Sequence, residues 1–267
     1  MVEKLGRLID LVFPPRCTNC EELLDFVGTR SADALCKTCL AKWETEKSDA
    51  CGYCMNAVSE CTCMPKALET AGCMAFYKLT YYRHGTRSFV QNQLIFRIKN
   101  TRDRHAVSFL ASELDTVIER AGVDALLDPE QTVLVYVPRR RSAYLESGTD
   151  QAKDLAVALS KKTNLPIVRA LIRKKGNQKE QKTLSTGERL RNARASYEVC
   201  ADAPIKGKTV LLVDDIVTTG ASMAACVKKL KRAGACAVYC IAVASDDANQ
   251  APLGALPSKG SLLVGEH

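Results

Sequence analysis

The sequence of 267 residues has no apolar run long enough to cross a membrane. A membrane-spanning helix needs roughly 18 or more consecutive apolar residues. The apolar run at residues 8–13 is shorter, is interrupted by Asp10 and precedes two prolines, with no small-residue cleavage site after it. These features also exclude a secretory signal. We therefore expect a soluble, cytoplasmic protein with no membrane span.

Two common nucleotide-binding signatures are missing as well. The chain contains neither a loop ending in Gly-Lys-Thr or Gly-Lys-Ser nor a Gly-x-Gly-x-x-Gly fingerprint, which excludes the usual P-loop and dinucleotide-binding motifs. Low-complexity tracts are absent, and hydrophobic residues make up 46% of the chain. A disordered or collagen-like chain is therefore excluded, and the length suffices for one large domain or two smaller ones.

Cysteine, in contrast, is abundant: the chain has 13, and nine of them lie within the first 73 residues. A reducing cytoplasm disfavours a disulfide framework, so we interpret these residues first as metal ligands or buried apolar side chains. Two C-x-x-C pairs separated by fifteen residues have the spacing of a zinc ribbon, in which two knuckles supply four thiolates to one ion. The ligands predicted for this first site are Cys17, Cys20, Cys36 and Cys39.

A second set of four cysteines follows at shorter spacing, as one C-x-x-C pair and one C-x-C pair. We interpret it as a second zinc site, in which Gly52 frees the backbone to form a knuckle. Four protein ligands at each site predict structural rather than catalytic zinc, and the compact cysteine runs of iron–sulfur proteins are not seen. The five remaining cysteines are interpreted as buried apolar side chains. The second set is Cys51, Cys54, Cys61 and Cys63.

The rest of the chain alternates between apolar strands and amphipathic helices. Short segments rich in Val, Ile and Leu are typical of strands buried on both faces of a parallel sheet, and the segments between them have the apolar stripe of helices. This alternation indicates right-handed crossovers and a doubly wound, mostly parallel α/β sheet. The predicted strands are 132–137, 165–172, 209–213 and 238–244, and the predicted helices are 105–121, 151–161 and 221–233, the last capped by Gly234.

Charge is distributed unevenly along the chain, whose formal net charge is +8. Residues 1–65 have 7 basic and 10 acidic side chains, whereas residues 66–245 have 30 basic and 17 acidic ones, a local +13. We predict three parts: a double zinc ribbon at 1–65, an α/β domain at 66–245 and a flexible tail at 246–267. The basic α/β domain indicates polyanionic ligands.

The segment 210–222 has the features of a site for a phosphorylated sugar. An apolar strand ends at Asp214 and Asp215, and a loop of small and hydroxyl residues leads into a helix. Backbone N–H groups and the helix dipole hold phosphate at such a position, and adjacent carboxylates accept hydrogen bonds from vicinal hydroxyls. The alternative is an ordinary acidic strand end with a capping threonine. The predicted phosphate ligands are Thr218, Thr219, Gly220, Ala221 and Ser222.

This segment resembles the 5-phosphoribosyl-1-pyrophosphate (PRPP) motif of type I phosphoribosyltransferases, which implies that the acids bind ribose hydroxyls and the TTG loop binds the 5-phosphate. Together with the paired cysteines after Pro14-Pro15-Arg16, the arrangement from about residue 5 to 245 is similar to the ComF family, known for its member in bacterial competence. The resemblance implies a type I phosphoribosyltransferase fold with an N-terminal double zinc ribbon. Further matches are Ile98-Lys99, Val137-Pro138, and Gln181, Arg189 and Asn192 before the acidic motif.

One element of the family is altered in this chain. Where the family typically has Arg-Gly-Phe-Asn-Gln, the chain has Ser147-Gly148-Thr149-Asp150-Gln151, so an arginine that ordinarily helps to handle anionic substrate is lost. Arg139 and Arg140, in the triple arginine 139–141, stand where the family would contact pyrophosphate; the alternative is a solvated basic loop. Some relatives have a general-base carboxylate at the position of Thr218. This chain has threonine there, so no catalytic base is assigned.

The resemblance implies binding of PRPP with Mg²⁺ and, on turnover, displacement of pyrophosphate from C1 through an oxocarbenium-like transition state. PRPP binding is predicted ahead of turnover, and the acceptor is not identified; a PRPP-sensing regulator is one alternative. Another is a competence factor that binds single-stranded DNA and competence-machinery proteins, as the family's role implies. The basic candidates for DNA contact are Arg97, Lys99, Arg102, Arg104, Arg173, Lys174 and Lys175. The aromatic candidates for base stacking, which otherwise pack inside, are Tyr77, Tyr81, Tyr82, Phe89 and Phe96.

Overall fold

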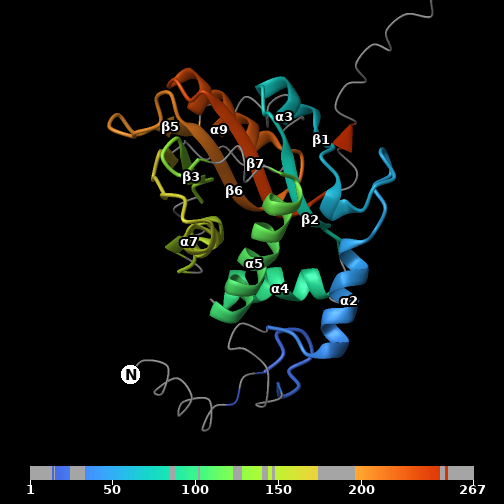
Figure 1. The fold of residues 1–267 in the computed structure, drawn as a ribbon. Coiled ribbons are helices and arrows are strands. Elements are labelled where there is room, and N and C mark those ends of the chain that lie inside the picture. Colours follow the sequence, from blue (N-terminus) through green and yellow to red (C-terminus); the bar gives the residue numbers. More distant parts are fainter. Residues whose placement is uncertain are drawn as a thin grey trace, which may run out of the picture.

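The protein is described by a computed structural model, in which a four-stranded parallel sheet forms the centre (Figure 1). The sheet has the order β2 (Phe76–Tyr81), β7 (Ala237–Ser245), β6 (Thr209–Val217), β3 (Thr132–Tyr136). The structure describes residues 14, 16–24, 34–84, 88–101, 103–122, 128–139, 144–145, 148–173, 196–246 and 250–251. In these segments no helix is long and apolar enough to span a membrane.

Helices cover both faces of this sheet, as predicted for a doubly wound fold. Alternate residues along β6 point to opposite faces, so that Leu211 belongs to one apolar core and Leu212 to the other. The first core includes α2 (Lys37–Lys47), α4 (Val90–Asn100), α5 (Arg104–Arg120) and α7 (Gln151–Thr163), and the second includes α3 (Lys66–Ala71) and α9 (Ala221–Arg232).

Three of the four predicted strands pair in the central sheet, and the predicted helices correspond to α5, α7 and α9. The predicted strand 165–172 is wrong in its length and pairing. Only Ile167 bridges to β3 in parallel, through Leu134, and the chain then turns away to form β4 (Leu171–Arg173). β4 pairs with β5 (Tyr197–Val199) in an antiparallel ribbon outside the main sheet.

The edge strand β2 was not predicted, because its polar residues hide the apolar pattern of a buried strand. All six of its residues are buried, including Thr80 and the fully buried Lys78. Burial of a lysine requires polar partners that the local sequence does not reveal. These partners come from the second cysteine set, described below.

The N-terminal cysteine segment shares the first core with the α/β domain. Trp43 of α2 is fully buried, and its indole nitrogen donates to Glu113 of α5 at 2.8 Å. The carboxylate of Glu46 accepts hydrogen bonds from the first backbone N–H groups of α4, at Val90 and Gln91. A charged group at this position satisfies otherwise unpaired donors of the helix start.

The predicted junction near residue 65 and the predicted tail meet in a short two-stranded ribbon. β1 (Met64–Pro65) pairs with β8 (Gln250–Ala251) in antiparallel fashion. The structure describes residues 246 and 250–251 of the predicted tail. Gln250 and Ala251, which follow the α/β segment, therefore pair with the end of the cysteine segment.

Candidate functional site

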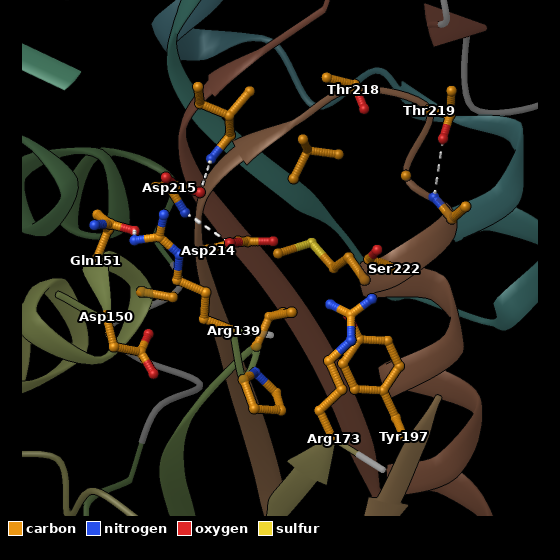
Figure 2. Close-up of a pocket in the computed structure, with 18 of the residues that line it drawn as sticks. Arg139, Asp150, Gln151, Arg173, Tyr197, Asp214, Asp215, Thr218, Thr219 and Ser222 are labelled. Carbon is orange, nitrogen blue, oxygen red and sulfur yellow. Dashed lines mark hydrogen bonds between the residues drawn. The ribbon is translucent and has the colours of Figure 1, made fainter. Parts of the chain in front are cut away.

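A pocket of about 350 Å³ opens at the carboxyl ends of β3 and β6 (Figure 2). This edge of a parallel sheet is where doubly wound folds bind their ligands. The acidic pair and the loop 218–222, which the sequence predicts to bind a sugar phosphate, both line the pocket. The lining residues are Lys99, 137–139, 150–152, Arg173, Tyr197 and 214–223.

The two adjacent carboxylates lie at the floor of the pocket. Strand β6 stays paired with β7 from Thr209 to Val217, beyond both acids, so the sheet holds the backbone of Asp214 and Asp215. Asp215 forms an ion pair with Lys99 of α4, with 3.4 Å between Oδ2 and Nζ. Burial raises the pKa of Asp214 well above its ordinary value, and the neighbouring charge of Asp215 raises it further.

The loop after these acids leads into α9 at a single left-handed residue, Gly220, with φ of 72°. The N-cap residue Gly220 has no side chain to cap α9, and the first residues of the helix line the pocket, where the positive end of the helix dipole favours an anion. Thr219 Oγ1 accepts from the backbone N–H of Ala221 at 3.4 Å. Figure 2 shows Thr218 and Thr219 on this loop above Ser222, an arrangement that suits a phosphate group.

Arg139 is positioned by the segment that replaces the family's Arg-Gly-Phe-Asn-Gln element. Its Nη1 donates to Gln151 Oε1 at 2.7 Å and to the carbonyl and hydroxyl of Thr149 at 3.0 and 3.2 Å. Thr149 Oγ1 in turn donates to the carbonyl of Lys99 at 2.9 Å. The altered segment thus hydrogen-bonds both to the side chain of Arg139 and to the backbone of Lys99, two pocket cations that are distant in the sequence.

A third cation enters the pocket from the antiparallel ribbon of β4 and β5. Arg173 lies directly across the ribbon from Tyr197. Its guanidinium lies 4.9 Å from the centre of the Tyr197 ring, and its Nη1 donates to the Tyr197 hydroxyl at 3.0 Å. Burial raises the pKa of Tyr197 to about 12. Figure 2 shows both side chains next to Ser222.

The basic residues proposed for DNA contact that the structure describes lie in different surroundings. Lys99 and Arg173 line the pocket, Arg97 pairs with Glu21, and Arg104 is exposed at the start of α5. Among the aromatic candidates, Tyr77 and Tyr81 are buried and Phe96 is exposed. Several predicted residues lie outside the described segments, namely Arg102, Arg140, Arg141, Ser147, Lys174, Lys175, Gln181, Arg189 and Asn192.

The sequence predicts DNA contact for Lys99 and Arg173 and does not single out Tyr197. Lys99 had been matched to a family element, which was a usable signal. Arg173 and Tyr197 carried no such signal, because only their pairing across the ribbon brings them to the pocket.

Both sets of cysteines gather as the spacing predicted. Within each set the four sulfur atoms lie within 4.8 Å of one another, which fits a tetrahedral four-thiolate metal site. The first set is Cys17, Cys20, Cys36 and Cys39, and the second is Cys51, Cys54, Cys61 and Cys63.

The C-x-x-C loops at Cys17 and Cys51 have the same backbone hydrogen bonds, as repeated knuckles should. In each loop the first cysteine donates to the carbonyl five residues later and accepts from the N–H four residues later. That fourth residue, Glu21 or Met55, has φ of 62°. Gly52, which we expect to help form the knuckle by freeing the backbone, does not have a positive φ; the left-handed residue of this loop is Met55.

Burial and polar neighbours act in opposite directions on the pKa values of these thiols: burial raises the pKa of Cys39 to about 12 and also raises that of Cys61, while nearby donors oppose it. Asn19 Nδ2 donates to Cys39 Sγ at 3.1 Å, and Lys78 Nζ lies 3.5 Å from Cys61 Sγ. Burial by itself would raise the pKa of Cys51. Hydrogen bonds from the Tyr81 hydroxyl and from nearby backbone N–H groups outweigh burial and lower it to about 6.

Residues 145–262 match the family model of the phosphoribosyl transferase domain. The adenine phosphoribosyltransferase of Bordetella avium (strain 197N) is 35% identical over 112 residues, which are 42% of this chain and 60% of that protein. The chain thus spans less than two thirds of this curated relative. The matched segment contains the pocket loop and α9 and is similar to the phosphoribosyl transferase domain.

Two solved structures are also similar. The allosteric regulatory enzyme of purine biosynthesis is 22% identical with a TM-score of 0.30, over 42% of this chain and 21% of that one. A hypoxanthine phosphoribosyltransferase from Staphylococcus aureus is 17% identical with a TM-score of 0.33, over 55% of this chain and 66% of that one.

Proposed function

We propose that this chain is a ComF-type protein that binds PRPP with Mg²⁺ in the pocket at the end of β6. The observation that carries the proposal is one cavity of about 350 Å³ that is lined both by the acidic pair and by the start of α9. A phosphorylated sugar requires both groups, one for its hydroxyls and one for its phosphate.

The three pocket cations suit the pyrophosphate and phosphate charges of this ligand. The 5-phosphate would lie on the loop 218–222, with Arg173 nearby, and the ribose hydroxyls on Asp214 and Asp215. Arg139, held by Thr149 and Gln151, would meet the pyrophosphate. Mg²⁺ would arrive with PRPP and neutralise pyrophosphate oxygens, next to the Asp215 carboxylate.

Binding is proposed ahead of turnover because the described pocket offers no carboxylate suited to activating an acceptor. Asp150 caps α7, its Oδ1 accepting from the N–H of Lys153 at 3.3 Å, and the other pocket carboxylates face the ribose site. A transferase that receives its nucleophile already activated, or a sensor of PRPP in bacterial competence, agrees with this site.

Calorimetric titration with PRPP and Mg²⁺ tests the proposal. Asp215→Asn removes a charged acceptor for ribose hydroxyls, which is worth about 1.5–3 kcal/mol, so its affinity should fall roughly 10-fold or more. Asp202→Asn is the matched control, because Asp202 is an exposed carboxylate outside the pocket. Equal binding by wild type and Asp215→Asn, or no binding heat from wild type, would refute the proposal.

A second candidate function is binding of single-stranded DNA, favoured by a basic hollow on α9. Lys228, Lys229 and Arg232 line this hollow of about 120 Å³. Polyanion binding there would weaken as salt rises, because condensed counterions are released from the nucleic acid. We expect the logarithm of the affinity for an oligonucleotide to fall linearly with that of the salt concentration, and a flat dependence would exclude this mode.

A further inference from the structure

We propose that the second cysteine set positions the phosphate loop through Pro65, so that metal held by these cysteines and ligand held in the pocket stabilise each other. This inference rests on the proposed function and on a metal ion at Cys51, Cys54, Cys61 and Cys63. It concerns Pro65 and Gly220, whose contact joins the two sites.

The phosphate loop packs so closely on Pro65 that there is no space for a side chain at Gly220. A Cβ atom added to Gly220 would lie 2.9 Å from Pro65 Cβ and 3.3 Å from its Cγ, with Leu68 Cγ at 3.5 Å. Gly220 is also the left-handed residue from which α9 starts. The position of Pro65 and α3 therefore determines where the first turn of α9 faces the pocket.

Pro65 is in turn fastened to the second cysteine set by the chain itself. Cys63 lies two residues before it, and the backbone N–H of Cys63 donates to Cys61 Sγ at 3.3 Å. Strand β1 follows immediately and is paired to β8. A change in the geometry of Cys61 and Cys63 would reach Pro65 with no flexible linker between them.

Lys78 holds the same cysteines against the central sheet. Its Nζ donates to the carbonyls of Cys61 and Cys63 at 3.1 and 2.9 Å. A buried ammonium needs negative charge nearby, and a four-thiolate site with Zn²⁺ carries two negative charges. The metal site thus stabilises Lys78 in β2, and Lys78 keeps the Cys61–Cys63 segment beside β2 at the edge of the central sheet.

A coupling of this kind must be reciprocal, because two sites that bias one shared conformation stabilise each other equally. Occupation of the phosphate loop should therefore slow metal loss from the second set. Coupling between sites typically amounts to about a 5- to 150-fold change in affinity.

The first arm of the test measures zinc release to an excess of a chromogenic chelator from the zinc-loaded full chain. Cys20→Ser and Cys54→Ser identify which kinetic phase belongs to which set. Saturating ribose 5-phosphate should slow the second-set phase about fivefold or more. Pro65→Gly should abolish this protection, whereas Pro65→Ala, which retains the Cβ that faces Gly220, should keep most of it. An unchanged second-set phase in protein that calorimetry shows to bind the sugar phosphate would overturn the coupling.

The second arm needs no ligand and so separates this inference from the proposed function. Gly220→Ala pushes a methyl group against Pro65, and it should accelerate zinc release from the second set while leaving the first-set phase unchanged. An unaltered second-set phase would overturn the coupling even if ribose 5-phosphate does not bind. Equal acceleration of both phases would mean general loosening and would overturn it as well.

Discussion

At the scale of single residues, the pocket depends on charges that burial alone would not tolerate. Asp214 lies next to Asp215 at the end of a buried strand, and their mutual repulsion is opposed by Lys99. Such an arrangement costs stability in the free protein and is retained where a ligand uses it.

Asp214 should make the stability of the fold depend on pH. Its pKa lies well above the ordinary value near 3.8, so the folded chain holds this proton at pH values where the unfolded chain has lost it. The contribution of the carboxyl is complete below the unfolded pKa and is lost as pH rises through the folded pKa. At pH values above the ordinary pKa of an aspartate, wild type should therefore lose more stability with rising pH than Asp214→Asn.

Urea unfolding at a series of pH values measures this difference. Asp202→Asn, at an exposed position, should follow wild type. Any pH-dependent loss of metal is shared by all three chains and cancels in the comparison. Parallel curves for wild type and Asp214→Asn would contradict the expectation.

Thr149 and Gln151 show how the loss of an arginine from a family motif can be compensated by a cation from another segment. Both side chains are almost completely buried, at 1% and 4% exposure. They place Arg139 through hydrogen bonds, whereas a family arginine at position 147 would act directly. The cation therefore comes from a different segment of the chain, which the local motif does not reveal.

At the scale of elements, the first cysteine set and α2 form one unit with the α/β domain. Helix α2 begins directly after Cys36 and contains Cys39 in its first turn. About one turn after Cys39, Trp43 packs edge-on against Phe109 of α5, with ring centres 5.7 Å apart. Metal binding by this set should therefore stabilise the packing of α2 on α5.

The single tryptophan reports on this element. Cys20→Ser removes one thiolate of the first set, so α2 should loosen and expose Trp43, and the emission should shift to the red with one zinc lost per chain. Cys54→Ser should also lose one zinc but leave the emission unchanged. Fluorescence spectra together with metal analysis measure both effects. A metal content below one zinc per chain in wild type, or the same shift in both variants, would contradict this expectation.

Three strands that the sequence pattern does not reveal or misplaces, β2, β4 and β5, share a physical cause. The pattern of β2 is obscured by Lys78, which is buried only because the carbonyls of Cys61 and Cys63 accept from it. β4 and β5 are three residues each and gain their form from pairing with each other. In both cases the decisive contacts join segments that are distant in sequence.

At the scale of the whole molecule, the excess positive charge of residues 66–245 is partly concentrated at one point. Lys99, Arg139 and Arg173 come from three separate segments and all line the pocket. The net charge of +8 does not show this convergence. Spatial arrangement makes the same charges a ligand site where the sequence indicates only a polyanion preference.

The sequence by itself determined the features that short contiguous segments contain. These are the two cysteine spacings, the buried strands β3, β6 and β7, and the acidic pair followed by the loop into α9. Each depends on local periodicity or on ligand spacing, which a single segment carries completely.

Only the tertiary structure decided which cations face the acidic pair and what supports the phosphate loop. Arg139 reaches the pocket through Thr149 and Gln151, and Arg173 through its pairing with Tyr197. The contact of Gly220 with Pro65 joins positions 155 residues apart. Such contacts follow from the packing of crossovers on the sheet, and packing between distant segments leaves no periodic signal in either of them.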